Sequence, residues 1–174
     1  DNGKNSSDLG NVALFPIIKS DTHIINVGVK NSYIEIFGRS AAIVGFVEQN
    51  SNSKDILIDS CFSDETVTIV HSRLNEATGV CSGGIMGGTL FTPDIKVSNC
   101  YSTAVLKGPY SSGKIIASIW MAPESVVAEN CFGDGKMWGC TSQSNMLKTY
   151  YNSYSTVAPN ATYTNWTQLS AEQM

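Results

Sequence analysis

The feature that most constrains the fold of this chain is a three-residue phrase that recurs along its length. The phrase reads Asn or Ser, then Cys or Ser, then Phe or Tyr, and a short stretch with alternating apolar residues precedes most copies. Self-similar segments repeated at intervals of roughly 20 to 50 residues are typical of stacked repeat architectures. We identify five copies: Asn31-Ser32-Tyr33, Ser60-Cys61-Phe62, Asn99-Cys100-Tyr101, Asn130-Cys131-Phe132 and Asn152-Ser153-Tyr154.

The stretch before each phrase has the periodicity of a strand. Ile56 and Ile58 stand six and four positions before one aromatic residue, and Ile95 and Val97 hold the same places before the next. Apolar residues at every second position predict a strand with one buried face. The interval between copies varies, which a stacked core tolerates when the extra residues lie in loops.

A second apolar element, containing glycine or small residues, lies upstream of the phrase in residues 41–46, 83–88 and 114–119. Glycine inside a strand usually marks a bend or a close approach of two backbones. We therefore expect three short strands in each coil. One coil cannot bury its own apolar face, so the sequence predicts an all-β fold, a right-handed parallel β-solenoid (β-helix) of about four to five coils.

The chain divides into three parts on this interpretation. Residues 1–9 are expected to be an N-terminal linker or capping segment, residues 10–155 the solenoid, and residues 156–174 a C-terminal capping segment. Ser170 and Gln173 have the spacing of a capping box, which predicts a short helix beginning at the C-terminus. Because the chain starts at Asp1 without an initiator Met, we expect it to be a processed piece with neighbouring domains.

The cysteines are expected to be structural. Cys61, Cys100 and Cys131 occupy the middle of the phrase, where the other two copies have Ser. That substitution favours free thiols packed in a stack, although coils about 4.8 Å apart also lie within reach of a disulfide. Asn side chains before the cysteines would cap the bend. We expect a structural ladder at this corner: Asn31, Cys61, Asn99, Cys100, Asn130, Cys131 and Asn152.

Three segments resemble the GLUG repeats of bacterial proteins. They are Gly-Gly-Ile-Met-Gly-Gly at 83–88, Val-Ser-Asn-Cys-Tyr-Ser-Thr at 97–103, and the phrase at 26–33. The resemblance covers roughly residues 10 to 174, and the chain departs from it at Lys114, Ala117 and Trp120. It implies a secreted or surface-anchored protein, such as an adhesin-like protein or the non-catalytic part of an IgA-cleaving metalloprotease.

Composition excludes several kinds of partner. The net charge is −4 and no basic run is present, so a nucleic-acid partner is not expected. No apolar stretch approaches the roughly 20 residues of a membrane-spanning helix, so no membrane insertion is expected. His23 and His71 lack a metal-binding spacing, so we expect them to be turn residues exposed to solvent. The cysteines lack paired Cys-x-x-Cys spacing. We expect no metal, no cofactor and no catalytic residue.

Two groups of side chains leave functional alternatives open. Asp55 and Asp94 hold the same place in successive units and could form the acid pair of a carbohydrate-active enzyme, although solvated turn residues are the simpler interpretation. Trp138, Tyr151 and Trp166 belong to an aromatic cluster near the C-terminus that could bind a ligand such as a sugar ring. The same cluster could instead cap the end of the solenoid.

The resulting hypothesis is a non-enzymatic repeat domain of a bacterial protein, at the cell surface or outside the cell, that acts as an adhesive surface or structural stalk. Its partner would be a host glycan or surface protein. The alternatives are a glycan-binding module, a carbohydrate-active enzyme, or a non-catalytic part of a surface protease.

Overall fold

The structure is a computed structural model that describes part of the chain in detail. The described residues are 10–36, 38–48, 55–71, 81–89, 94–107, 112–119, 126–135, 150–151, 153–156, 167–170 and 173. Among the sequence predictions, the N-terminal segment 1–9 and the residues Trp138, Asn152 and Trp166 lie outside them.

The described chain is a succession of short strands arranged in coils. The first coil contains β1 (Asn11–Val12), β2 (Phe15–Ile18), β3 (His23–Ile25), β4 (Gly28–Val29) and β5 (Tyr33–Ile36). The second contains β6 (Arg39–Ala41), β7 (Val44–Val47), β8 (Ile56–Asp59), β9 (Phe62–Ser63) and β10 (Thr68–His71). The third contains β11 (Cys81–Gly83), β12 (Met86–Thr89), β13 (Ile95–Ser98), β14 (Tyr101–Ser102) and β15 (Val105–Lys107).

The later coils contribute fewer described strands. The fourth coil contains β16 (Ser112–Gly113), β17 (Ile116–Ile119), β18 (Val126–Glu129) and β19 (Phe132–Gly133). They are followed by β20 (Tyr150–Tyr151), β21 (Tyr154–Ser155) and β22 (Thr167–Gln168).

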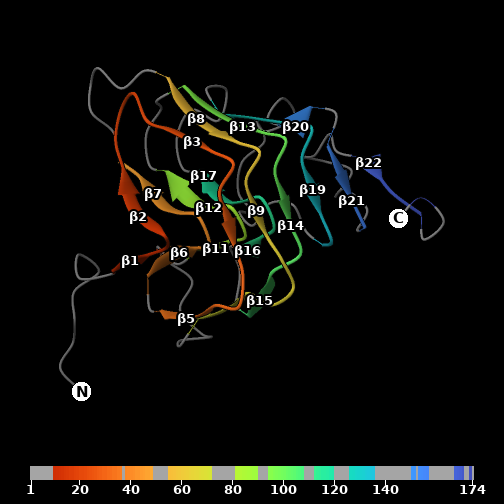
Figure 1. Ribbon diagram of the computed structural model, residues 1–174, viewed down its shortest axis with the longest axis horizontal. Coiled ribbons are helices and arrows are strands. Elements are labelled where there is room, and N and C mark those ends of the chain that lie inside the picture. Colours follow the sequence, from red (N-terminus) through yellow and green to blue (C-terminus); the bar gives the residue numbers. More distant parts are fainter. Residues whose placement is uncertain are drawn as a thin grey trace.

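Each strand pairs in parallel with the strand at the same position of the next coil. This pairing produces sheet 1 (β1-β6-β11-β16), sheet 2 (β2-β7-β12-β17), sheet 3 (β3-β8-β13-β18-β20), sheet 4 (β4-β9-β14-β19-β21-β22) and sheet 5 (β5-β10-β15). In Figure 1 the colours run from red at one end of the stack to blue at the other, because successive coils follow one another along a single axis. The predicted parallel β-solenoid is confirmed.

The number of strands in a coil was predicted incorrectly. The second and third coils each contribute a strand to five sheets, not three. The glycine-containing element is divided by a bend at residues 42–43, so that Arg39–Ala41 and Val44–Val47 belong to different sheets. The aromatic residue of the phrase and the residue after it also form a two-residue strand, because the chain turns a corner at the first residue of the phrase.

The register of the first coil was also predicted incorrectly. Gly28 pairs with Phe62, whereas Tyr33 pairs with Thr68 in sheet 5. The first copy of the phrase is therefore Asn26-Val27-Gly28 and not Asn31-Ser32-Tyr33. A side chain at Gly28 would overlap the ring of Phe62, which lies over this glycine. The first coil thus lacks the aromatic residue that marks the other copies.

The described part contains no helix, so the predicted C-terminal helix is absent from it. One of the two contacts of a capping box is nevertheless formed, together with a backbone turn. The Ser170 N–H donates to Gln173 Oε1 at 2.9 Å, and the Gln173 N–H donates to the Ser170 carbonyl oxygen at 3.0 Å. Residues 171, 172 and 174 lie outside the described residues.

The core runs along the axis as columns of stacked apolar side chains. Ile43, Ile85 and Ile115 follow one another at the bend between sheets 1 and 2, and each is 0% exposed. Ile58 and Val97 form a similar column in sheet 3. Burial of these columns supplies the main driving force for folding, since no single coil could shield them from water.

Close backbone contacts explain why glycine is required in sheet 2. A Cβ on Gly87 would overlap the carbonyl oxygen of Gly45, and a Cβ on Gly45 would lie 2.6 Å from the carbonyl oxygen of Pro16. Both obstacles are backbone atoms of the preceding coil, which cannot move without breaking the register.

We predict that Gly87→Ala destabilises the fold by roughly 1–3 kcal/mol, the usual cost of overpacking. Urea unfolding followed by circular dichroism measures the effect. Gly10→Ala is the matched control, because no atom lies within 4 Å of the added Cβ. Equal stabilities of the two variants would contradict the close approach.

Candidate functional site

The corner between sheets 3 and 4 carries the repeated phrase. Asn26, Ser60, Asn99 and Asn130 stand at this corner with φ values of 58°, 52°, 53° and 53°. Asn adopts this left-handed conformation more readily than most non-glycine residues. The corner therefore requires a short polar residue in every coil.

Side chains at this corner form a ladder on the outer surface. The Asn130 Nδ2 donates to Asn99 Oδ1 at 3.2 Å, and the Asn99 Nδ2 donates to Asp59 Oδ1 at 2.8 Å. The hydrogen bond from Ser98, together with those from Asn99 and Ser60, holds the pKa of Asp59 below its ordinary value against the opposing effect of burial. Asn99 and Asn130, two residues of the expected ladder, are therefore in side-chain contact.

Asn31 does not belong to this ladder, contrary to the prediction. It also has a positive φ, 48°, but it lies at the next corner, between sheets 4 and 5. Its N–H donates to Thr66 Oγ1 at 2.7 Å. Asn26 takes the place that the sequence analysis assigned to Asn31. The sequence did contain a signal for this, because Asn26 follows the apolar Ile24 by two residues, as Ser60 follows Ile58.

The cysteines form a column of thiols inside the same corner. Cys61, Cys100 and Cys131 are free and at most 1% exposed, which confirms the prediction of stacked free thiols. The Cys61 N–H donates to Cys100 Sγ at 3.4 Å, and the Cys131 N–H donates to Ser153 Oγ at 3.1 Å. Ser153 thus replaces a thiol in the next coil, as the sequence indicated.

Each thiol also donates a hydrogen bond to a backbone carbonyl two residues earlier. The Sγ–O distances are 3.2 Å from Cys61 to Asp59, 3.1 Å from Cys100 to Ser98, and 3.3 Å from Cys131 to Glu129. The Sγ atoms therefore accept from one coil and donate within their own. The three carbonyl groups also accept a backbone N–H from the preceding coil, so the thiols add a second contact to each of them. The Cys61 N–H, by contrast, has Cys100 Sγ as its acceptor.

Most of this column is held in the protonated form. The hydrogen bond with Cys131, together with burial, raises the pKa of Cys100 to about 12 against the opposing effect of Cys61. The hydrogen bond with Cys100 and burial raise the pKa of Cys61 above its ordinary range, whereas the hydrogen bond with Cys100 lowers the pKa of Cys131. Because the thiolate is the nucleophilic form, Cys61 and Cys100 have the properties of packing groups.

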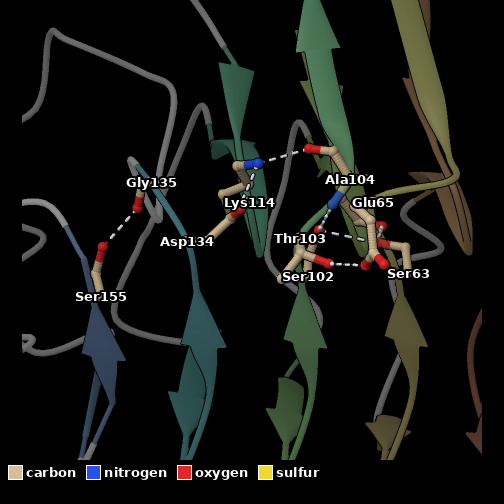
Figure 2. Close-up of polar contacts among 10 residues, drawn as sticks. Ser63, Glu65, Ser102, Thr103, Ala104, Lys114, Asp134, Gly135 and Ser155 are labelled. Atoms are coloured by element: carbon tan, nitrogen blue, oxygen red, sulfur yellow. Dashed lines mark hydrogen bonds and ion pairs between the residues drawn. The ribbon is translucent and has the colours of Figure 1, made fainter. Parts of the chain in front are cut away.

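A second polar cluster lies inside sheet 4 and at the turn that follows it (Figure 2). Ser63 Oγ lies 2.8 Å from Ser102 Oγ and 2.9 Å from the carbonyl oxygen of Gly84. The Ala104 N–H donates to Ser102 Oγ at 3.4 Å. Both serines are fully buried, so their hydroxyl groups are hydrogen-bonded inside the stack and have no access to a substrate.

Lys114 adapts the fourth coil to this cluster. A Cβ on Gly84 would overlap the side chain of Ser102, so the third coil needs glycine there. In the fourth coil Lys114 follows Gly113, the partner of Gly83, while Gly133 pairs with Ser102. The third coil thus combines the small Gly84 with Ser102, whereas the fourth coil combines the large Lys114 with the small Gly133.

The ammonium group of Lys114 has two oxygen partners in Figure 2. It donates to the Ala104 carbonyl oxygen at 2.6 Å and pairs with Asp134 Oδ1 at 2.6 Å. Its side chain is only 14% exposed, so the ion pair is largely shielded from water. Lys114, where the sequence departs from the repeat pattern, therefore does not interrupt the stacking of the fourth coil on the third.

The acidic residues at strand ends are placed as the repeat predicts. The Ile56 N–H donates to the Asp94 carbonyl oxygen at 3.1 Å, so Asp55 and Asp94 stand side by side on adjacent coils. Asp55 pairs with His23 at 3.3 Å, and both side chains are exposed to solvent. An exposed ion pair of this kind contributes little to stability.

The remaining histidine lies in the core. His71 is 1% exposed, and its Nε2 lies 3.3 Å from the carbonyl oxygen of Gly38. The sequence placed it in a turn in solvent, which is wrong because the inward face of β10 carries it. Among the described residues, no group of three or more His, Cys, Asp and Glu side chains could hold a metal ion.

The aromatic residues of the phrase form a column on the outer face of sheet 4. The register aligns Phe62, Tyr101, Phe132 and Tyr154 on successive coils. The rings of Phe62 and Tyr101 are stacked, with centroids 5.1 Å apart and planes 7° from parallel. Tyr101 is 41% exposed and Tyr154 is 37% exposed. We call these four side chains the aromatic column.

The aromatic column was not recognised as a candidate surface from the sequence, which favoured the C-terminal aromatics. Trp138 and Trp166 lie outside the described residues. Tyr151 belongs to β20 in sheet 3, and its side chain is also outside the description. The regular recurrence of an aromatic residue in each copy was the signal for the column.

Comparison with known proteins gives no match among family models, curated proteins or solved structures. No helix in the described part of the chain has the length and apolar character needed to cross a membrane.

We predict that Cys100→Ala lowers the free energy of unfolding by more than Cys100→Ser does. Alanine leaves the Cys61 N–H without its acceptor, and an unsatisfied buried donor costs about 1–3 kcal/mol. Serine keeps an acceptor and a donor at this place, as Ser153 does in a later coil. Urea unfolding of both variants measures the difference, and an alanine variant as stable as the serine variant would contradict the role of the thiol column.

The raised pKa of Cys100 also predicts an alkaline loss of stability. Its pKa rises from 9.0 to about 12 on folding, so the protonated thiol stabilises the fold below pH 9 and that contribution disappears as the pH rises from about 9 to about 12. Cys100→Ser removes this titration. We expect its urea midpoint to fall less than that of the original chain between pH about 8 and about 11. If the urea midpoints of the two chains fell equally over this pH range, the expected rise in the pKa of Cys100 on folding would be contradicted.

Proposed function

We propose that this chain is a non-enzymatic repeat domain of a secreted or surface-anchored bacterial protein, in which a rigid solenoid carries an adhesive surface. The observation that carries this proposal is the division of side chains between interior and surface. Cys61, Cys100, Ser63 and Ser102 are buried and hydrogen-bonded, whereas tyrosine rings recur on the outer face of sheet 4. The GLUG resemblance supports the same class of protein.

The regular register supports a rigid scaffold. The residues of the phrase pair with their counterparts across β9, β14, β19 and β21 without interruption. Parallel strands at this spacing give about 4.8 Å of length per coil. Such a surface presents equivalent side chains at a constant interval, so a partner could contact several coils at once.

The geometry of the aromatic column favours a protein partner over a glycan. The rings of Phe62 and Tyr101 face one another, so one flat surface of each ring is occupied within the pair, and the Lys30 ammonium lies 5.3 Å from the Phe62 ring centroid. The exposed atoms of Tyr101 remain for a partner. Tyrosine side chains of this type are common at the centre of protein interfaces.

Glycan binding through Trp138, Tyr151 and Trp166 remains the alternative proposal. A carbohydrate-active enzyme with Asp55 and Asp94 has less support, because His23 already pairs with Asp55 and the site is exposed.

The test uses the chain with Tyr101 and Tyr154 both replaced by Ser. We expect the original chain to bind immobilised host matrix proteins, and the double variant to lose roughly 5- to 150-fold in Kd, from about 0.5–1.5 kcal/mol for each ring. Tyr33→Ser is the control, because Tyr33 is 65% exposed but lies in sheet 5, outside the column.

Surface plasmon resonance against matrix proteins and, separately, a panel of host glycans distinguishes the candidates. Binding to glycans alone, unchanged in the double variant, would support the alternative. An equal loss in Tyr33→Ser would contradict a role for the aromatic column.

A further inference from the structure

The aromatic column already holds a cationic side chain in its second coil. The Lys30 Nζ lies 5.3 Å from the centroid of the Phe62 ring and 3.4 Å from Asp64 Oδ2. Asp64 follows Phe62 by two residues, so a ring and a neighbouring carboxylate hold the ammonium group together. The face of an aromatic ring attracts a positive charge, and a carboxylate beside it adds to that attraction. The column therefore accepts a cation at one end, and the chain itself supplies that cation.

Tyr101, in the third coil, has no such cation in the described part of the chain. Lys30 comes directly after β4 and Asp64 directly after β9, so the pairing of these two strands places them at equivalent positions. The coil before Tyr101 thus offers a carboxylate where the coil before Phe62 offers an ammonium group. The Tyr101 ring stacks on Phe62, and among the described residues no ring contact joins it to Phe132. Because Tyr101 is also 41% exposed, it remains accessible to a partner.

Two carboxylates of the second coil flank Tyr101. On one side, Asp59 Oδ1 accepts a hydrogen bond from Asn99 Nδ2 at 2.8 Å. On the other side, Glu65 Oε2 accepts one from Thr103 Oγ1 at 3.3 Å, as Figure 2 shows. Asn99 and Thr103 stand two residues before and two residues after Tyr101, which is roughly 7 Å along an extended chain. Contacts with the third coil therefore hold both carboxylates beside the ring.

The described lysines do not balance the charge of these two carboxylates. The hydrogen bond from Ser98, with smaller contributions that include the charge of Lys96, holds the pKa of Asp59 below its ordinary value. The same Lys96 ammonium group pairs with Glu129 at 2.8 Å, so one positive charge serves two carboxylates. Among the described residues, neither Asp59 nor Glu65 forms an ion pair. The other lysines near the column are already paired, Lys30 with Asp64 and Lys114 with Asp134.

We propose that Tyr101, Asp59 and Glu65 bind an arginine side chain of a protein partner, a proposal that rests on the adhesive role of the aromatic column. The guanidinium group lies against the exposed part of Tyr101 and donates to the Glu65 carboxylate, while Asp59 adds a second negative charge. Arginine fits better than lysine, because its planar group can stack on a ring and donate to a carboxylate at once. The partner is therefore a protein segment with exposed arginine, and a neutral glycan does not match this charge.

Surface plasmon resonance of the whole chain over immobilised peptides tests the proposal. One peptide contains four Gly-Arg pairs, and two matched peptides carry lysine or the neutral arginine analogue citrulline in place of arginine. We expect the arginine peptide to bind most tightly, the lysine peptide more weakly, and the citrulline peptide least. The affinity for the arginine peptide should fall between about 0.1 M and about 1 M NaCl, since salt screens exposed charges.

Two substitutions locate the arginine on the surface. Glu65→Gln removes the charge but keeps an oxygen that can accept from Thr103, and Tyr101→Ser removes the ring. We expect each to raise the Kd for the arginine peptide roughly 2- to 5-fold, the effect of one exposed cation–π contact or ion pair. Glu35→Gln is the matched control, because it changes the net charge by the same amount at an exposed residue of sheet 5. Circular dichroism verifies that every variant is folded.

The outcomes separate this site from the adhesive role itself. Equal affinity for the arginine and citrulline peptides, or equal losses in Glu65→Gln and Glu35→Gln, would overturn the arginine site. Binding of matrix proteins that depends on Tyr101 and Tyr154 but is unchanged in Glu65→Gln would also overturn it, and would leave the adhesive role standing. Arginine-peptide binding that weakens in Tyr101→Ser and Glu65→Gln supports the site, even if no matrix protein binds and the adhesive role fails.

Discussion

Hydrogen bonding between equivalent positions of successive coils is the constraint on which the rest of this structure depends. Parallel pairing continues through every sheet only if each coil turns the same corner with the same backbone geometry. Asn26, Ser60, Asn99 and Asn130 meet that condition with nearly identical positive φ values. Inside the corner the thiol column links successive coils, because Cys100 Sγ accepts a hydrogen bond from the Cys61 N–H of the preceding coil and donates one to the Ser98 carbonyl oxygen of its own coil.

The same stacking buries most of the side chains that could otherwise act as nucleophiles or ligands. Cysteine and serine side chains that elsewhere act as nucleophiles are buried here between coils. Lys114 is held by Asp134 and a backbone carbonyl group. Function is therefore expected on the faces that the stacking leaves outside, and the aromatic column is one such face. The aromatic column presents partly exposed rings, and Tyr101 and Tyr154 add hydroxyl groups, so the column suits a partner with mixed polar and apolar groups.

Much of the fold was predictable from the repeat, because each coil satisfies the same local requirements. The stacked strands, the free thiols at Cys100 and Cys131, the exchange of Cys for Ser153 and the amide contact of Asn99 with Asn130 all follow from recurrence at equal positions. The first coil was not predictable in this way. Gly28 stands where other copies have an aromatic residue, so the pattern pointed to Tyr33, and only the register with Phe62 corrected it.

The sequence by itself determined that the chain stacks in parallel coils with a small polar corner, since period and residue type are local properties. The tertiary structure decided which atoms meet between coils and which surfaces stay exposed. That division has a physical reason: whether Tyr101 packs inward or outward, or whether Gly28 meets an aromatic ring, depends on neighbours about 30 to 40 residues away that only the folded register brings together.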